Sequence, residues 1–214
     1  MENGSLAGKF IVLDGPDGCG KSTQVKLLAE KIGNTGIDVE TYRDPGATKV
    51  GEGIRKILLD PSSGDIDVRC EMLLYMAARA QLWAEKISPA LSSGKCVLLD
   101  RWLSSTCAYQ GYAGGFGIRG VMKIAEDSLE KPLPDITIIL DVDADTAAQR
   151  LKSTPDRMEQ KGSSYHFKVR EGFLKLPEYR DNIEVISAAD DIRKVHRKIL
   201  EKLNQRGFDI NVIQ

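Results

Sequence analysis

The chain has 214 residues, which is enough for one sizeable core and short for two independent domains. Its apolar share of 42% and charged share of 29% lie near globular averages, which excludes disordered, collagen-like and coiled-coil classes. The formal net charge is −1, so no overall basic field exists to recruit nucleic acid. We therefore expect a single domain over residues 1–214 with no nucleic-acid partner.

The apolar runs indicate neither a membrane span nor a signal peptide, and the cysteines indicate no zinc site. No apolar run approaches the ~20 residues that span a bilayer, and residues 1–9 lack the apolar core of a signal peptide. The cysteines form no Cys-x-x-Cys pair and have no histidine at zinc spacing. We expect a cytoplasmic protein without membrane contact, whose four cysteines are reduced, small apolar side chains.

Short apolar runs alternate with longer helical patterns along the chain. Short apolar runs predict strands at 10–14, 39–42, 96–100, 136–142 and 183–187, of which the run at 39–42 is weaker. Continuous rather than alternating apolarity suits strands that are buried on both faces of a parallel sheet. Helical patterns cover 21–32, 50–59, 70–90, 120–129, 145–151 and 191–203. This alternation predicts right-handed crossovers and a three-layer α/β fold, with a five-stranded parallel sheet flanked by helices. Ligands of such folds bind at the carboxyl ends of the strands, where Asp14 and Asp100 lie.

A glycine-rich segment after the first strand matches the phosphate-loop pattern G-x-x-x-x-G-K-[ST] in full. Its residues are Gly15, Pro16, Asp17, Gly18, Cys19, Gly20, Lys21 and Ser22. The preceding strand and the following helix are the context in which such a loop surrounds phosphates with backbone N–H groups. We expect it to bind ATP, with Lys21 on the β- and γ-phosphates, Ser22 on Mg²⁺, and Thr23 extending the helix start.

The phosphate loop alone does not separate kinases from GTPases, ATPase motors or an idle nucleotide sensor. A GTPase needs Asn-Lys-x-Asp and Asp-x-x-Gly segments, which are missing where they are required, and a motor needs a longer chain. The pair Asp100-Arg101 at the end of the third predicted strand favours a phosphotransferase. The acid can hold Mg²⁺ or its water, and the arginine can clamp a phosphate, although a surface salt bridge is the alternative.

Four segments resemble thymidylate kinases. Residues 100–111 resemble the family's D-R-x-x-x-S-x-x-A-Y-Q-G stretch, and residues 43–48 its R-E-P-G-G-T, with Asp44 in place of Glu. Residues 74–82 are similar to its F-Y-A-A-R-x-Q-L helix, and residues 156–159, with Phe167 and Val169-Arg170, to its lid. The resemblance runs from about residue 10 to the last helix. It implies a P-loop NTPase fold, a homodimer, and the reaction of ATP and dTMP to ADP and dTDP with Mg²⁺, in dTTP biosynthesis.

The resemblance also implies roles on the acceptor side. Tyr75 and Arg79 share a helix face, so the ring would stack on thymine and the arginine contact its carbonyl, unless Tyr75 is simply core. Arg43 and Arg101 would hold the dTMP phosphate. Asp17 would reach the 3′-hydroxyl or a water near the acceptor, unless it is an ordinary turn residue. The remaining expected dTMP contacts are Pro45, which rigidifies its loop, Ser105 and Thr106 facing the base, Tyr109 against the deoxyribose C2′, and Gln110.

Phosphoryl transfer needs positive charge on the equatorial oxygens more than it needs a base. The loop has Gly18 where an arginine-bearing loop would carry the basic residue, so lid arginines of the bacterial type are expected to supply the charge. Residues 150–165 are interpreted as a mobile lid whose closure excludes water. Arg157 and then Arg150 are the candidates, beside Lys152, and a solvated basic turn is the alternative.

Overall fold

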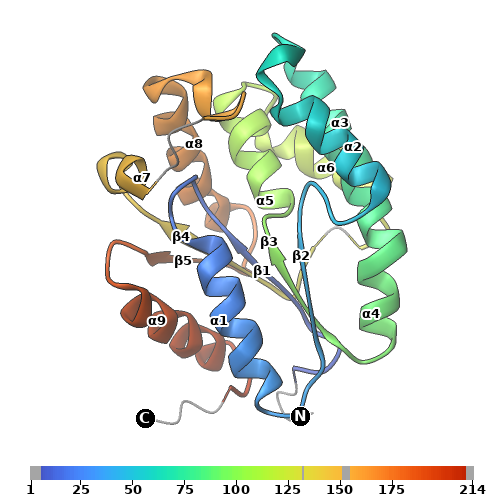
Figure 1. Cartoon of the computed structure of the whole chain (residues 1–214), viewed down its shortest axis with the longest axis vertical. Coiled ribbons are helices and arrows are strands. Elements are labelled where there is room, and N and C mark those ends of the chain that lie inside the picture. The colour runs from blue at the N-terminus through green and yellow to red at the C-terminus, as the bar shows by residue number, and fades with distance from the viewer. Residues whose placement is uncertain (1–5, 132, 151–154, 211–214) are drawn as a thin grey trace.

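Five parallel strands form the centre of the molecule (Figure 1). The computed structural model describes residues 6–131, 133–150 and 155–210. The strands are β1 (Phe10–Asp14), β2 (Val39–Arg43), β3 (Cys96–Asp100), β4 (Ile136–Asp141) and β5 (Ile183–Ser187), in the order β2-β3-β1-β4-β5. The expected five-stranded parallel sheet is confirmed, with strand ends that differ by one residue at most.

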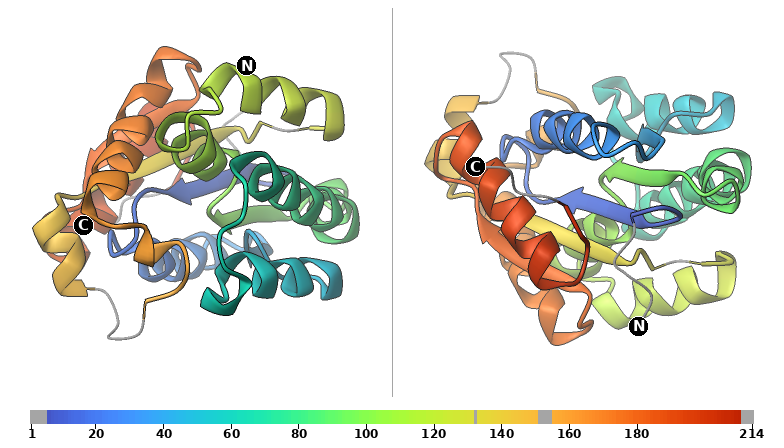
Figure 2. Two further views of the ribbon diagram at one scale, coloured as in Figure 1. Left: turned by 90° about the horizontal axis from the view of Figure 1, so that it is seen from above. Right: turned by 90° about the horizontal axis from the view of Figure 1, so that it is seen from below.

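Helices cover both faces of the sheet. They are α1 (Lys21–Gly33), α2 (Lys49–Leu59), α3 (Val68–Leu82), α4 (Ser88–Ser92), α5 (Leu103–Thr106), α6 (Ile118–Ser128), α7 (Ala144–Arg150), α8 (Ser163–Lys175) and α9 (Ile192–Gln205). π-helical segments span Trp83–Ile87 and Cys107–Ala113. Figure 2 shows α1 on one side of the sheet and α6 on the other. None of the helices in the described ranges is both long and apolar enough to cross a membrane.

Alternate residues of the central strands enter two different cores. Ile11 and Leu13 of β1 pack with the apolar side chains of α1 and α9, such as Leu28. Phe10 and Val12 pack on the opposite face with residues of α3, α6 and α8. Because the central strands β1, β3 and β4 are buried from both sides, their apolar runs are continuous rather than alternating, whereas the edge strands β2 and β5 are only partly buried.

Three helical regions differ from the expectation. The helix expected over 70–90 consists of α3, a π-helical turn and α4, because the N–H of Ser88 bonds to the carbonyl of Trp83 just before Pro89, which has no N–H to donate. The helices at 103–113 and 163–175 were not expected. The helix at 163–175 contains Gly172, because a Cβ at this position would lie 3.0 Å from the Cα of Ala108. Glycine has a low helix propensity, so it weakens the helical pattern in the sequence.

Candidate active site

The phosphate loop connects β1 to α1 at the carboxyl edge of the sheet. Gly15 has φ 139° and Gly18 has φ 78°, both of which favour glycine. A methyl group on Gly15 would lie 2.5 Å from the carbonyl oxygen of Leu140, so the loop packs directly on the end of β4. No side chain caps α1, which leaves its first N–H groups free to bind an anion.

Lys21 folds back over this loop. Its Nζ donates to the carbonyl oxygens of Gly15 at 3.1 Å and Pro16 at 2.8 Å, and it contacts the Sγ of Cys19. Only 7% of Lys21 is exposed, so its charge is held against the loop rather than in solvent. A phosphate chain in the loop would therefore meet a preoriented ammonium group.

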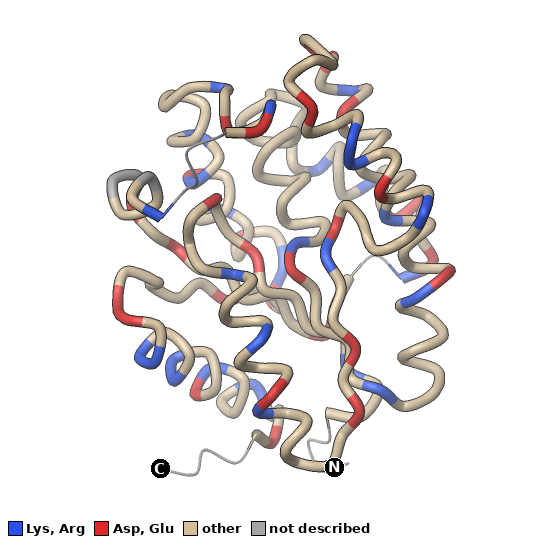
Figure 3. The backbone as a smooth tube through the Cα atoms, viewed as in Figure 1, with Lys and Arg blue, Asp and Glu red and all other residues tan. Residues whose placement is uncertain are grey.

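A large open cleft of about 820 Å³ lies above the loop. Ser22 and Asp100 both line this cleft, where the Oγ of Ser22 donates to the Oδ2 of Asp100 at 2.5 Å. Both side chains offer oxygen atoms, which are the ligands that Mg²⁺ prefers, and a bound metal would take the place of this hydrogen bond. Figure 3 shows acidic and basic residues side by side where β2 and β3 end.

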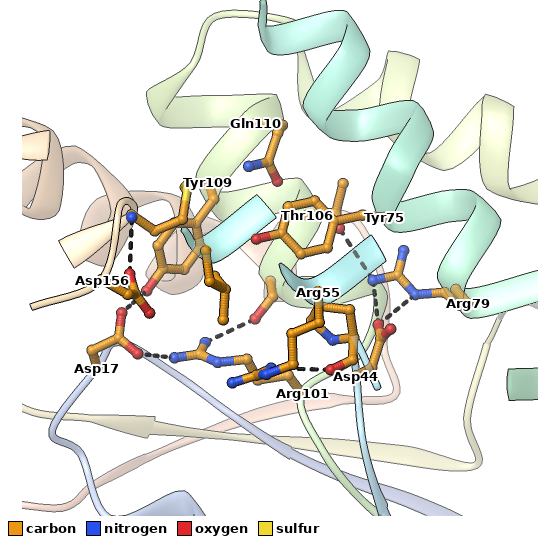
Figure 4. Close-up of a pocket in the computed structure, with 14 residues that line it drawn as sticks. Asp17, Asp44, Arg55, Tyr75, Arg79, Arg101, Thr106, Tyr109, Gln110 and Asp156 are labelled. Carbon is orange, nitrogen blue, oxygen red and sulfur yellow. Dashed lines mark hydrogen bonds and ion pairs between the residues drawn. The ribbon is translucent and has the colours of Figure 1, made fainter. Parts of the chain in front are cut away.

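A smaller cavity of about 80 Å³ adjoins the cleft (Figure 4). All of the acceptor residues expected from the sequence line it, with the exception of Arg43. The residues that line the cavity are Asp17, Asp44, Pro45, Arg55, Leu59, Tyr75, Arg79, Arg101, Ser105, Thr106, Tyr109, Gln110, Asp156 and Met158. Five of these, Asp17, Asp44, Arg55, Arg101 and Asp156, also line the cleft, so the two spaces meet at these side chains.

A buried ion pair forms one wall of the cavity. The Nε and Nη2 of Arg79 donate to the Oδ2 of Asp44 at 2.8 and 2.5 Å, and both side chains are 1% exposed. Burial raises the pKa of the Asp44 carboxyl, although the charge of Arg79 opposes the shift. Nη2 also donates to Trp102 O and Thr106 Oγ1, whereas the hydrogen-bond partner of Nη1 among the described residues is the Sδ of Met76. Nη1 is therefore the part of Arg79 best able to reach a ligand.

A second charged network lies at the junction of cleft and cavity. Arg101 binds Asp17 through Nη2, and its Nη1 donates to Gly15 O and Ser105 Oγ, each at 2.9 Å. The hydroxyl of Tyr109 donates to the Oδ2 of Asp17 at 2.7 Å. Burial alone would raise the pKa of Asp17, but the charges of Arg101 and Lys21 and the Tyr109 hydrogen bond hold it well below its usual range. The Asp17 carboxylate is thus held in place at the junction of cleft and cavity.

Arg101 adopts a left-handed backbone conformation with φ 72°. This costs a residue with a Cβ about 1–2 kcal/mol, and such strain concentrates at functional sites. The N–H of Arg101 bonds to the carbonyl of Leu13, which holds the turn after β3 against β1. The strained turn directs the guanidinium back across the sheet edge toward Asp17.

Arg55 is a cavity residue that the sequence reasoning missed. Its Nη1 donates to the carbonyl of Pro45 at 3.0 Å, and within the described ranges no carboxylate lies at ion-pair distance from it. Burial lowers the pKa of Arg55, and the neighbouring charge of Arg43 adds to this effect. A partly buried cation without a counter-ion is suited to bind an anion. Arg55 is one of several charged residues on α2, and no sequence pattern marked it as a cavity residue.

Arg43 and the lid arginines lie differently from the acceptor residues. Arg43 lines the cleft and pairs with Glu52 at 3.1 Å, with its side chain 54% exposed. Arg150 lines the cleft and donates to the carbonyl of Ala188 at 3.2 Å. Arg157 is buried, and its Nη2 pairs with the Oε1 of Glu71 at 2.7 Å rather than facing the phosphate loop. Residues 151–154 of the expected lid, which include Lys152, lie outside the described residues.

Comparisons with known proteins find similarity over nearly the whole chain. The thymidylate kinase family model matches residues 13–199. A thymidylate kinase of Thermoanaerobacter sp. (strain X514) is 44% identical over 198 residues, which are 92% of this chain and 97% of that protein. That of Caldanaerobacter subterraneus subsp. tengcongensis is 41% identical over 202 residues, 94% and 97% of the two chains. The crystal structure of thymidylate kinase from Ehrlichia chaffeensis superimposes with a TM-score of 0.76 at 31% identity, covering 92% of this chain and 99% of that one.

Proposed function

The chain belongs to the thymidylate kinase family, so it converts dTMP to dTDP, and we propose that the cleft binds the phosphoryl donor ATP while the cavity binds dTMP. Membership confirms the expected P-loop NTPase fold and kinase activity. The observation that carries the proposal is the contact between the two spaces, which share Asp17, Arg55 and Arg101. Two nucleotides bound there would bring their phosphates together at the guanidinium groups of Arg55 and Arg101.

On the donor side, the backbone of residues 15–20 and the start of α1 bind the phosphates of ATP. Lys21 exchanges its carbonyl partners for the β- and γ-phosphate oxygens. Ser22 and Asp100 hold Mg²⁺ directly or through water, as their adjacent oxygens suit. The metal, when bound, neutralises phosphate charge.

On the acceptor side, the ring of Tyr75 stacks on the thymine, and Arg79, Thr106 and Gln110 contact its polar edge. The ring of Tyr109 lies against the deoxyribose, and the phosphate pairs with Arg101 and Arg55. Arg55 joins this set because its guanidinium lacks a carboxylate among the described residues. Pro45 and Ser105 complete the cavity, and Arg43 would have to leave Glu52 to reach the phosphate.

Catalysis in this arrangement is positioning and charge neutralisation. The acceptor oxygen belongs to an ionised phosphate, so no general base is required. Asp17 fixes the guanidinium of Arg101 at the junction. Arg150 already lines the cleft and, among the described residues, would give up the carbonyl of Ala188 to reach the transferred group, whereas Arg157 would have to break its buried pair with Glu71.

We further propose a cytoplasmic homodimer. Val50 and Ile57 on α2 and Leu73 on α3 are large apolar side chains that are about half exposed. These two helices pack side by side at the outer side of the molecule (Figure 1). An apolar surface of this kind is suited to pairing with a second copy of the chain.

A coupled assay with dTMP, dUMP, dCMP, dGMP and thymidine tests the substrate assignment. We expect dTMP to have the highest kcat/KM, and preference for another acceptor would overturn the thymidylate claim. Lys21→Ala should lower kcat about 10²- to 10³-fold while calorimetry still detects dTMP binding, since Lys21 does not line the cavity. The exposed Lys26 on the same helix gives a matched control, Lys26→Ala, with wild-type turnover. No turnover with any acceptor would favour an idle nucleotide sensor.

A further inference from the structure

A fully buried carboxylate joins the acceptor cavity to the segment that precedes α8. Glu71 lies in the first turn of α3 and is 0% exposed. Its Oε1 accepts from Arg157 Nη2 at 2.7 Å and from Lys161 Nζ at 2.8 Å. Its Oε2 accepts from Gln110 Nε2 at 3.0 Å. One carboxylate is thus the shared acceptor of two cations from residues 155–161 and of one amide from the cavity wall.

Residues 155–161, which we call the lid base, form part of the cavity. Asp156 and Met158 line the cavity, and Asp156 also lines the cleft. Besides its pair with Glu71, Arg157 bonds to α2, through its Nε to Leu58 O at 2.7 Å and its N–H to Leu59 O at 2.9 Å. The position of the lid base therefore depends on buried polar contacts that end at the acceptor site.

The same carboxylate determines which way the amide of Gln110 points. An ionised carboxylate can only accept hydrogen bonds, so Gln110 must present its NH₂ group to Glu71. Its carbonyl oxygen is then left for the cavity, and Figure 4 shows this amide facing Tyr75 and Thr106. An N–H group on the edge of a bound base would meet an acceptor whose orientation Glu71 maintains.

We propose that Glu71 is a positioning residue that couples acceptor binding to the lid base. The inference rests on the proposed assignment of the cavity to dTMP. A base that donates to Gln110 favours the amide orientation that needs Glu71 as acceptor. The orientation of the Glu71 carboxylate that accepts from Gln110 through Oε2 also places Oε1 against Arg157 and Lys161. By thermodynamic linkage, a well-held lid base must strengthen dTMP binding by the same factor by which dTMP stabilises the lid base.

Hydrogen exchange combined with calorimetry tests this coupling. The probes are the backbone amides of residues 156–161 with and without saturating dTMP, and the variants are Lys161→Met and Glu71→Gln. Lys161→Met leaves the Arg157–Glu71 pair in place, so it remains informative if Glu71→Gln does not fold. Lys168→Met removes an exposed lysine from α8 and is the matched control.

In the wild type and in Lys168→Met, dTMP should slow exchange of these amides. In Lys161→Met the bound-to-free ratio of exchange rates should move toward one, and the Kd for dTMP should rise about fivefold. A folded Glu71→Gln should lose most of the dTMP-dependent protection. Equal dTMP protection in Lys161→Met and wild type would overturn the coupling, as would dTMP binding that leaves the wild-type amides unchanged. Failure of dTMP to bind at all would instead refute the acceptor site, and the coupling with it.

Discussion

Replacing Asp44 by Asn removes the counter-charge of Arg79 with almost no change in shape. The guanidinium would remain 1% exposed with only neutral acceptors, Trp102 O, Thr106 Oγ1 and one amide oxygen. Breaking a buried ion pair costs about 3–5 kcal/mol, and the retained amide hydrogen bond favours the lower end. A chain of this length loses about 2–4 °C of Tm per kcal/mol, so we expect a decrease of about 6–12 °C.

Calorimetric unfolding at neutral pH measures this loss, with Glu52→Gln as the matched control. That variant also removes one carboxylate from an arginine, but the Arg43–Glu52 side chains are 54% and 46% exposed. We expect the control to change stability by about 1 kcal/mol at most. If Asp44→Asn lost no more stability than Glu52→Gln, the reasoning from burial would be refuted. The KM for dTMP should also rise in Asp44→Asn only, because Arg79 lines the cavity.

Three other expectations follow from the same site. Arg55→Met should raise the KM for dTMP about tenfold or more in steady-state assays, because a charge-assisted phosphate contact is lost, while Lys56→Met on the same helix should not. Tyr109→Ala should lower the kcat/KM preference for dTMP over ribothymidine monophosphate about tenfold, and Tyr109→Phe, which keeps the ring, should retain it; equal ratios in both variants would contradict the steric role. Because the pKa of Asp17 is lowered in the fold, its contribution to stability is present above the ordinary value of about 3.9 and is lost as pH falls. Urea unfolding of wild type and Asp17→Asn should therefore differ by a constant amount near neutral pH, and this difference should begin to shrink as the pH falls below about 4.

The sheet could be predicted from sequence because its signal is local. The central strands β1, β3 and β4 are short apolar runs between polar residues, and the glycine-rich loop has its strand before it and its helix after it. The acceptor residues came from several motifs in order, and the cavity brings all but Arg43 of them together. Local pattern and family resemblance were sufficient for these features.

The features that were missed depend on contacts between distant segments. Gly172 weakens the helical pattern of α8 because it packs against Ala108, which no local pattern records. Arg157 looked available as a lid cation, yet its position is determined by Glu71, a residue far away in the chain. Arg55 is one of several charged residues on α2, and only the folded chain distinguishes it.

The strand order has a consequence for how the chain is made. β1 leaves the ribosome first, but its Ile11 pairs with Leu98 and Ile136, and Gly15 packs against Leu140. A nascent chain that ends before β4 therefore carries the complete glycine-rich motif without the wall that shapes it, and we expect it to bind no ATP. During that interval the apolar side chains of β1 are without one of their two neighbouring strands and are prone to aggregate. Synthesis of β4 is thus the step at which nucleotide can begin to stabilise the growing protein.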